Sequence, residues 1–190
     1  MAQPRSSPNS ADAHYVGALP AGTRIAAVVS AYHEELCARM AESARRELER
    51  SGLAPENFFE LRAPGAFELP LIARRLAVRD DIDAVLCFGL VLKGETSHDG
   101  YIASAAANGI LNASMQTDTP ILFGVLTCET REQAEARALP AELGGVHDTG
   151  REVARATVMA IEALRLAADI GARERPAGFG PRPLESESSR

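Results

Sequence analysis

The sequence predicts an α/β protein in which a four-stranded parallel sheet is covered by helices on both faces. Two observations carry this prediction. Short apolar, β-branched runs alternate with segments whose apolar residues recur every three or four positions, in the order β-α-β-α-β-α-β-α-α. One run, residues 82–92, is apolar almost throughout, which is typical of a parallel strand buried on both faces. Right-handed crossovers between successive strands then place helices on both sides of the sheet.

The first half of the sequence predicts two strand–helix units after a flexible N-terminal segment. Residues 1–21 are rich in Ser, Pro and Ala and show no periodicity. In the first helix apolar residues recur at helical spacing from Leu36 to Leu48, and Gly52 ends it. Pro64-Gly65 forces the turn between the second strand and its helix. The two units are strand 23–30 with helix 34–50, and strand 57–62 with helix 67–78.

The second half predicts two more strands, three helices and a disordered C-terminal tail over residues 171–190. Gly109 lies inside a small-residue helix, whose small side chains permit the close approach of another helix, from the same chain or from another subunit. Pro120 ends that helix before the fourth strand, and residues 139–150 form a loop. The expected elements are strand 82–92, helix 97–115, strand 121–127, a short charged helix 129–138 and a long helix 151–170. The folded domain is therefore expected to span residues 22–170.

Length and composition limit the classes of protein to consider. A chain of 190 residues and 20.2 kDa suits one domain with a proper core. A net charge of -6 at pH 7 argues against a general nucleic-acid binder. No apolar run approaches the roughly 20 residues that a membrane span needs. We therefore expect neither a nucleic acid nor a membrane as a partner.

Cysteine usage and the N-terminal composition predict the compartment. Cys37, Cys87 and Cys128 are odd in number and lack CxxC spacing, which argues against a disulfide framework or a zinc site. Cys87 lies within an apolar run and is expected to be a core residue. The first 22 residues lack the apolar block of a signal peptide, and so we expect a cytoplasmic protein.

Candidate functional residues follow each predicted strand. In parallel α/β sheets, ligands bind beyond the carboxyl ends of the strands. The candidates are Tyr32 and His33 after the first strand, residues 65–68 after the second, residues 90–98 at the end of the third, and Cys128 and Glu129 after the fourth. This convergence predicts one ligand site at that edge of the sheet.

The segment around His98 carries the clearest chemical signals. Gly94, Glu95 and Thr96 can present backbone N–H groups and a hydroxyl to an anion at the start of a helix. His98 lies in a polar junction where an imidazole suits proton transfer near neutral pH. The alternative is a capping or merely exposed histidine. His33 is a weaker candidate on the same grounds.

Several other side chains admit both a structural and a functional interpretation. Arg137 follows the fourth strand, where a guanidinium can clamp a phosphate, but a solvated surface arginine is the alternative. Phe67 and Phe123 are core aromatics or rings that stack on a planar heterocycle. Glu68 either caps its helix or contacts a ligand.

Five stretches together resemble the lumazine synthase (6,7-dimethyl-8-ribityllumazine synthase) family. Their order and spacing also match, and the similarity extends from about residue 24 to residue 164. The stretches are APGAFELP at 63–70, FGLVLKGETSHDGYI at 88–102, NGI at 108–110, TPILFGVLT at 119–127 and EQAEARA at 132–138.

The resemblance implies a three-layer, flavodoxin-like α/β/α protomer that forms a homopentamer with active sites between neighbouring subunits. It also implies the reaction of two small-molecule substrates without a metal or cofactor. These are 5-amino-6-(D-ribitylamino)uracil and 3,4-dihydroxy-2-butanone 4-phosphate, which condense to 6,7-dimethyl-8-ribityllumazine, phosphate and water in the penultimate step of riboflavin biosynthesis.

The matching motifs imply roles for individual residues. Tyr32 stacks on the pyrimidine, and His98 transfers protons. The uracil and ribityl chain contact Ala66, Phe67, Glu68, Leu90, Val91, Leu92 and Phe123. The phosphate is held by Glu95, Thr96 and Arg137. The residues around Tyr32 and His98 are expected to meet Phe123 and Arg137 across a subunit boundary.

The sequence departs from the family pattern at four places. Tyr32 replaces the usual Phe or Trp, and Lys93 stands where Arg is frequent. Asp99 directly follows the histidine, where an aromatic residue commonly separates His from the acid. The loop 139–150 is longer than in the icosahedral members, which favours a pentamer over a decamer or a sixty-subunit shell. The alternatives to the enzyme are a non-catalytic flavin- or lumazine-binding relative and a structural shell protein.

Overall fold

The computed structural model describes residues 17–171 of the chain. Most of the two predicted tails, residues 1–16 and 172–190, lies outside the described residues. Residues 17–21 of the segment predicted to be flexible are described, and Leu19 among them is buried. Its backbone N–H donates to the Ser51 carbonyl (2.8 Å), so this short stretch packs on the core.

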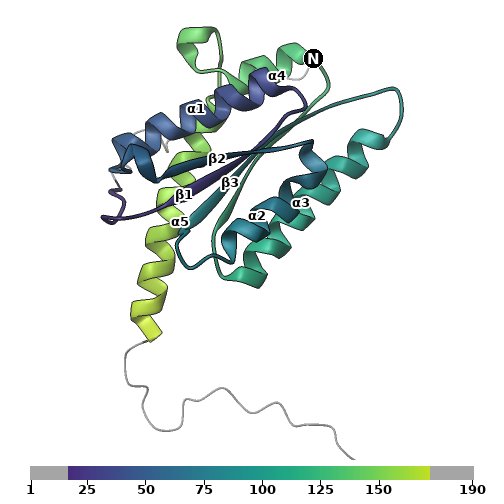
Figure 1. Cartoon of the computed structure of the whole chain (residues 1–190). Helices are drawn as coiled ribbons and strands as arrows, with labels where there is room; N and C mark the ends of the chain where they lie inside the picture. The colour runs from purple at the N-terminus through teal and green to yellow at the C-terminus, as the bar shows by residue number, and fades with distance from the viewer. Residues whose placement is uncertain (1–16, 172–190) are drawn as a thin grey trace, which may run out of the picture.

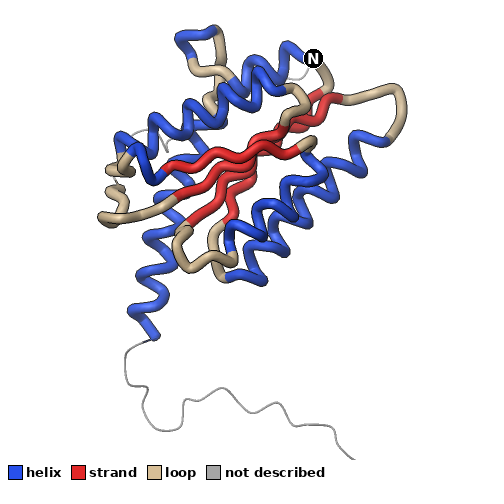
Figure 2. The backbone as a smooth tube through the Cα atoms, viewed as in Figure 1, coloured by secondary structure: helices blue, strands red, loops and turns tan. Residues whose placement is uncertain are grey.

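A four-stranded parallel sheet forms the middle of the molecule, as predicted (Figure 2). Its strands run in the order β2-β1-β3-β4, so β1 and β3 are central. Every neighbouring pair is parallel, and all four carboxyl ends therefore lie at one edge of the sheet. The strands are β1 (Ile25–Ser30), β2 (Phe58–Ala63), β3 (Ala84–Leu92) and β4 (Ile121–Cys128).

Helices cover both faces of this sheet and complete the predicted three-layer, flavodoxin-like α/β/α arrangement. Helices α1, α4 and α5 lie on one face, and α2 and α3 on the other (Figure 1). Alternate strand residues explain the two layers, because Ala27 and Val29 pack with the first group and Ala26 and Val28 with the second. The helices are α1 (Glu34–Arg50), α2 (Leu69–Ala77), α3 (His98–Thr117), α4 (Arg131–Ala138) and α5 (Thr149–Gly171).

The helix boundaries differ from the predicted ones where side chains or prolines set the ends. The helix predicted from residue 67 begins as a 3₁₀ turn at Ala66–Glu68, and α2 continues from Leu69 with Pro70 in its first turn. Helix α4 begins at Arg131 because the Thr130 hydroxyl accepts from the Gln133 backbone N–H (3.3 Å). The predicted loop 139–150 contains a further 3₁₀ turn at Ala141–Leu143.

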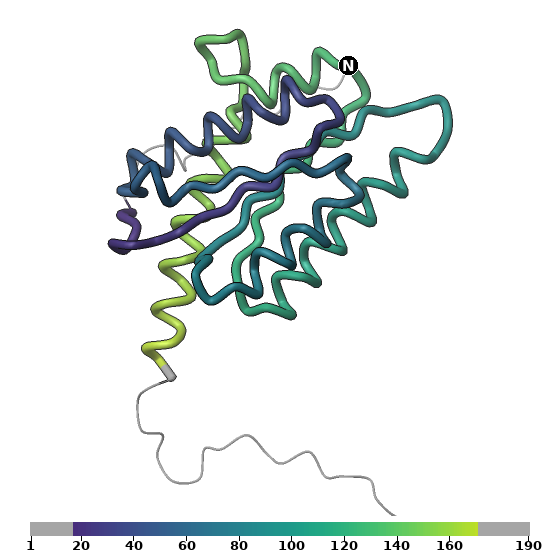
Figure 3. Tube along the Cα trace, in the orientation of Figure 1, coloured from purple at the N-terminus to yellow at the C-terminus, as the bar shows by residue number. Residues whose placement is uncertain are grey.

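Helix α5 begins at Thr149, earlier than predicted, because Asp148 caps it. The Asp148 carboxylate accepts from the Arg151 backbone N–H (3.1 Å) and from the Ser43 hydroxyl (2.7 Å). The cap therefore also ties α5 to α1. Beyond Ile161 helix α5 extends away from the sheet, and the loop before it projects outward beyond α1 (Figure 3).

Gly109 allows the predicted close approach of a second helix, which is α2. A Cβ built at Gly109 would lie 2.7 Å from Cγ of Pro70. The α3 backbone at Gly109 therefore packs directly against the Pro70 ring of α2. Among residues 17–171, no helix is both long and apolar enough to cross a membrane.

Candidate active site

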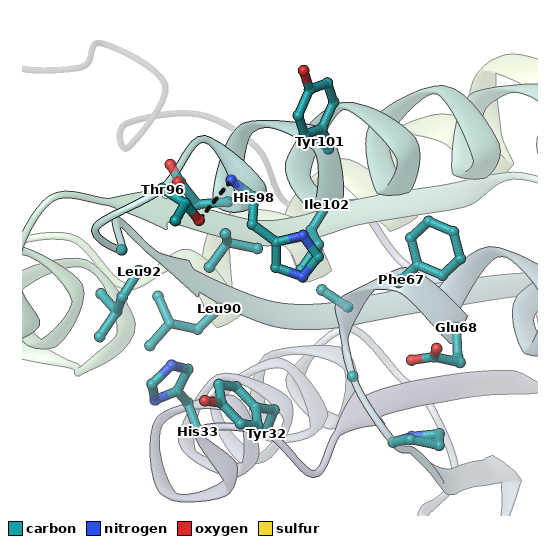
Figure 4. Close-up of a pocket in the computed structure, with 16 residues that line it drawn as sticks. Tyr32, His33, Phe67, Glu68, Leu90, Leu92, Thr96, His98, Tyr101 and Ile102 are labelled. Atoms are coloured by element: carbon teal, nitrogen blue, oxygen red, sulfur yellow. Dashed lines mark hydrogen bonds between the residues drawn. The ribbon is translucent and has the colours of Figure 1, made fainter.

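A cavity of about 880 Å³ opens at the carboxyl edge of the sheet (Figure 4). Its volume lies within the usual range for a small-molecule site, roughly 300–1,000 Å³. The ends of β1, β2 and β3 contribute its lining, because these three neighbouring parallel strands end together. The lining residues are Tyr32, His33, Pro64, Gly65, Ala66, Phe67, Glu68, Leu90, Val91, Leu92, Gly94, Thr96, His98, Asp99, Tyr101 and Ile102.

The turn after β1 presents Tyr32 to the cavity. The Tyr32 backbone N–H donates to the buried Ser30 hydroxyl (3.1 Å), and this hydroxyl donates to the Tyr32 carbonyl (3.1 Å). The Tyr32 side chain is 68% exposed and forms a T-shaped pair with the His33 ring, with 4.7 Å between the ring centroids. The backbone is therefore fixed while one aromatic face remains available to a ligand.

The turn after β2 forms the opposite wall. Ala66 is buried against the sheet, whereas Phe67 is 61% exposed at the cavity. The Glu68 carboxylate is half-buried on the same wall. Leu90 and Val91 at the end of β3 are buried and form an apolar floor between the two walls. A flat ligand in this cavity would therefore lie between the aromatic side chains of the two walls and above the aliphatic side chains of the floor.

The loop between β3 and α3 brings polar groups to the third side. Thr96 and Gly94 line the cavity, and Thr96 Oγ1 accepts from the His98 backbone N–H (3.4 Å). Ser97 makes no side-chain cap to α3, and a helix start of this kind favours an anion. Glu95, in the same loop, does not line the cavity of the single chain.

His98 begins α3, and its imidazole is directed toward the middle of the cavity (Figure 4). Asp99 also lines the cavity, but within residues 17–171 no hydrogen bond joins its carboxylate to the His98 ring. The exposed His98 ring is therefore free to meet a ligand without first breaking a protein contact.

Besides Glu95, the predicted site residues Phe123 and Arg137 lie outside this cavity, as do the candidates Cys128 and Glu129 after β4. Phe123 is in the middle of the edge strand β4, opposite Cys87, and its side chain is 45% exposed. Arg137 is on α4, where its Nη1 donates to the Gln133 carbonyl of the same helix (3.2 Å). Their predicted contact with the site across a subunit boundary stays a prediction.

Charge near the cavity is set by a small ion-pair cluster beside His33. Burial, followed by the nearby Arg131 guanidinium, lowers the pKa of His33, so its imidazole is neutral at pH 7. Arg131 donates to Glu135 (2.7 Å) and to Glu35 (3.0 Å), which links α4 to α1. On the other side of the loop, Lys93 Nζ lies 3.4 Å from Glu129 Oε1.

The cysteines contribute to packing. All three are buried and unpaired, as predicted for Cys87. Burial raises the pKa of Cys37 to about 12 and also raises that of Cys128. A thiol held protonated in this way is a poor nucleophile. The chemistry of the site therefore rests on the imidazoles, carboxylates and hydroxyls.

Sequence reasoning gave little weight to some residues that line the cavity. Tyr101 and Ile102 follow His98 by three and four positions and so lie on the same side of α3, a spacing that is visible in the sequence. His33 was the weaker histidine candidate, and its place in the cavity depends on the turn that also presents Tyr32.

A parallel sheet covered on both faces, with a cavity of small-molecule size at the carboxyl ends of its strands, is typical of the ligand-binding α/β proteins. The sequence profile of the 6,7-dimethyl-8-ribityllumazine synthase family matches residues 22–165. The chain belongs to this family.

Curated relatives that carry the family's name cover most of the chain. The 6,7-dimethyl-8-ribityllumazine synthase of Thermus thermophilus is 43% identical over 145 residues, which cover 76% of this chain and 88% of the relative. The enzyme of that name from Deinococcus deserti is 40% identical over 147 residues, which cover 77% of this chain and 90% of the relative. The enzyme of that name from Syntrophus aciditrophicus is 44% identical over 117 residues, which cover 62% of this chain and 76% of the relative.

Proposed function

We propose that the chain catalyses the penultimate step of riboflavin biosynthesis. In this step 5-amino-6-(D-ribitylamino)uracil condenses with 3,4-dihydroxy-2-butanone 4-phosphate to give 6,7-dimethyl-8-ribityllumazine, phosphate and water. One observation carries the proposal: in a chain that belongs to the lumazine synthase family, the cavity gathers the motif residues from three strand ends.

The apolar half of the cavity suits the uracil. The exposed Tyr32 ring provides a stacking face, and Phe67, Leu90 and Val91 provide apolar contacts. The Glu68 carboxylate can accept hydrogen bonds from the ribityl hydroxyls. Ala66, buried between this turn and the sheet, and Leu92 complete the contact surface.

The polar half suits the phosphate, with help from a second copy of the chain. The N–H groups at the start of α3, with Glu95 through its backbone and the Thr96 hydroxyl, favour an anion. The lining itself contains Glu68 and Asp99 but neither lysine nor arginine. A dianion beside two carboxylates needs a cation, and we assign this role to Arg137 of a neighbouring subunit.

His98 is the proposed proton-transfer residue. The amine of the uracil attacks the ketone, and water leaves to give a Schiff base. Phosphate then leaves by β-elimination, and the resulting enol tautomerises to a ketone. The ribityl-bearing amine attacks this ketone, and a second water leaves as the ring closes. Each step moves a proton, which an imidazole accepts and donates near neutral pH. Both substrates are already reactive, so binding them in the correct orientation supplies much of the remaining acceleration. The proposed route uses no metal or cofactor.

We also propose that the chain acts as a homo-oligomer, most simply a pentamer. Several large apolar side chains are exposed on α2, α3 and β4, including Leu71, Leu111, Met115 and Phe123. An exposed apolar surface of this kind commonly marks a protein interface. The projecting loop before α5, which the resemblance marks as longer than in the icosahedral members, favours a pentamer over a decamer or a sixty-subunit shell. A cytoplasmic location is proposed, supported by the three unpaired, buried cysteines.

A paired experiment tests the function and the assembly. Both substrates are mixed with the protein, and the lumazine chromophore and released phosphate are followed together. The mass of the same sample is measured by light scattering. We expect product and a particle five times the 20.2 kDa chain mass. No product at high protein concentration would refute the function, and tight binding of lumazine without turnover would indicate a carrier.

A further inference from the structure

The Tyr32 backbone is held more firmly than its exposed ring. The buried Ser30 hydroxyl bonds to both the N–H and the carbonyl of Tyr32, and the Cys37 thiol donates to the same carbonyl (3.6 Å). These contacts fix the position of Cα but leave the ring free to rotate about its side-chain torsions. Its T-shaped contact with His33, with the ring planes at 75°, is the aromatic contact that restrains this motion.

The backbone of His33 has an unusual conformation at the start of α1, and the His33 side chain does not cap that helix. His33 lies in the left-handed region (φ 58°, ψ 41°), where asparagine and glycine are favoured. It is also the residue before α1, a position where Ser, Asp or Asn normally caps a helix. The His33 side chain makes no cap hydrogen bond, although its carbonyl accepts from the Cys37 backbone N–H (3.2 Å). The imidazole instead forms the T-shaped pair with the Tyr32 ring in the cavity (Figure 4).

The electrostatic surroundings keep this imidazole uncharged. Burial and the Arg131 guanidinium both lower the pKa of His33. Arg131 is itself held in place by Glu35 and Glu135. At neutral pH the ring next to Tyr32 is therefore a neutral aromatic group, which packs against the phenol without placing a charge beside a planar ligand.

We propose that His33 is a positioning residue that fixes the Tyr32 ring in the orientation that stacks on the heterocycle. The inference rests on the proposed function, because it takes a ribityl-bearing pyrimidine or lumazine as the ligand. A ring that is restrained before binding loses less side-chain freedom when the ligand arrives. His33 thus acts through Tyr32.

Three substitutions separate the ring of His33 from its backbone conformation. His33→Asn and His33→Gly keep the left-handed conformation and remove the ring. His33→Phe restores an aromatic ring without a titratable nitrogen. The Kd for 6,7-dimethyl-8-ribityllumazine is measured by its fluorescence on the full-length protein, and Tm controls for folding. We expect His33→Asn and His33→Gly to raise Kd about five-fold, the factor that corresponds to about 1 kcal/mol for an aromatic pair. His33→Phe should stay within about two-fold of the parent protein.

Two further readouts distinguish positioning from a general structural effect. In a Tyr32→Leu background, His33→Asn should cause no additional loss, because the ring that it positions is gone. In steady-state assays the KM for the uracil should rise by the same factor as Kd, while kcat and the KM for the phosphate substrate stay unchanged.

Clear outcomes overturn the inference. These are an unchanged Kd in His33→Asn and His33→Gly, a loss that persists in the Tyr32→Leu background, or a His33→Phe variant that binds as weakly as His33→Asn. A parent protein that binds lumazine but makes none refutes the proposed function, while the binding series still decides the role of His33. A parent protein that does not bind lumazine refutes both.

Discussion

Replacing Gly109 with alanine should test how tightly α2 and α3 are packed beneath the cavity. Gly109 faces Pro70, and an added Cβ would lie 2.7 Å from Cγ and 2.8 Å from Cβ of that proline. Helix α3 carries His98 at its start, and α2 follows the turn that carries Phe67. A shift between the two helices would therefore also move two walls of the site.

Two opposing effects decide the sign of this change. Alanine improves helix propensity by about 1 kcal/mol over glycine. The new contact is well inside the roughly 3.5–4.0 Å optimum between carbon atoms, and a proline ring cannot rotate away. Overpacking of this kind typically costs about 1–3 kcal/mol. We therefore expect Gly109→Ala to destabilise the fold by about 1 kcal/mol, which corresponds to a decrease of roughly 2–4 °C in Tm for a domain of this size.

Gly100→Ala provides a matched control in the same helix. Among residues 17–171, a Cβ at Gly100 would have no atom within 4 Å other than those of its chain neighbours and its own helix backbone, so only the propensity effect of up to about 1 kcal/mol remains. Urea unfolding followed by far-UV circular dichroism, at one fixed protein concentration, compares both variants with the parent protein. If Gly109→Ala gained stability as Gly100→Ala is expected to, the packing argument would be wrong.

Three further predictions concern the site and acid stability. His98→Ala should lower kcat by about 10²- to 10⁴-fold and leave the Kd for lumazine unchanged. Arg137→Ala should raise the KM for the phosphate substrate by about tenfold or more and leave the KM for the uracil unchanged. Burial raises the pKa of Glu47. The guanidinium of Arg155, 2.8 Å away, is among the groups that lower this pKa by more than burial raises it, so the net shift is downward. The Glu47 carboxylate therefore stabilises the fold above about pH 4.5, and this contribution is lost as the pH falls through the lower folded-state value. Glu47→Gln should accordingly lower the free energy of unfolding at pH 7 and approach the parent protein in acid.

Each of these predictions has a control or an outcome that contradicts it. Arg46→Ala removes another exposed arginine, which pairs with Glu42 of the same helix α1, and should change neither KM. An unchanged phosphate KM in Arg137→Ala would remove that residue from the phosphate site. An unaltered kcat in His98→Ala would exclude His98 from proton transfer. For Glu47, a stability difference of equal size at pH 7 and in acid would contradict the ionic explanation.

Helix α1 and helix α5 show which parts of the fold sequence reasoning could reach. The bounds of α1, Glu34–Arg50, were predicted correctly because its apolar periodicity is local and Gly52 follows it. The start of α5 was placed too late because Gly150 looked like part of a loop. In the structure, a Cβ at Gly150 would collide with the Met40 carbonyl, so this glycine permits α5 to approach α1. Such a tertiary requirement has no signature in the local sequence.

In the candidate site, too, the sequence predicted some features and could not predict others. Parallel topology predicted that residues after all four strands converge. Those after β1, β2 and β3 do share one cavity, with Tyr32, Phe67 and His98, whereas Cys128 and Glu129 after β4 do not line it. Sequence blocks cannot say which chain supplies a residue. Phe123 lies in the middle of the outermost strand β4, five residues before the carboxyl end of that strand, and so it does not line the cavity of its own chain.

The charge of the cavity links the proposed catalysis to assembly. Its lining has two carboxylates, Glu68 and Asp99, and the Lys93 ammonium outside it is drawn toward Glu129. The heterocycle needs mainly rings and aliphatic carbon, which one chain already offers. The phosphate needs a cation, which the lining of one chain does not contain. A separated chain would therefore retain much of its affinity for the uracil and lose its affinity for the phosphate substrate, so that only an assembled protein would bring the two substrates together.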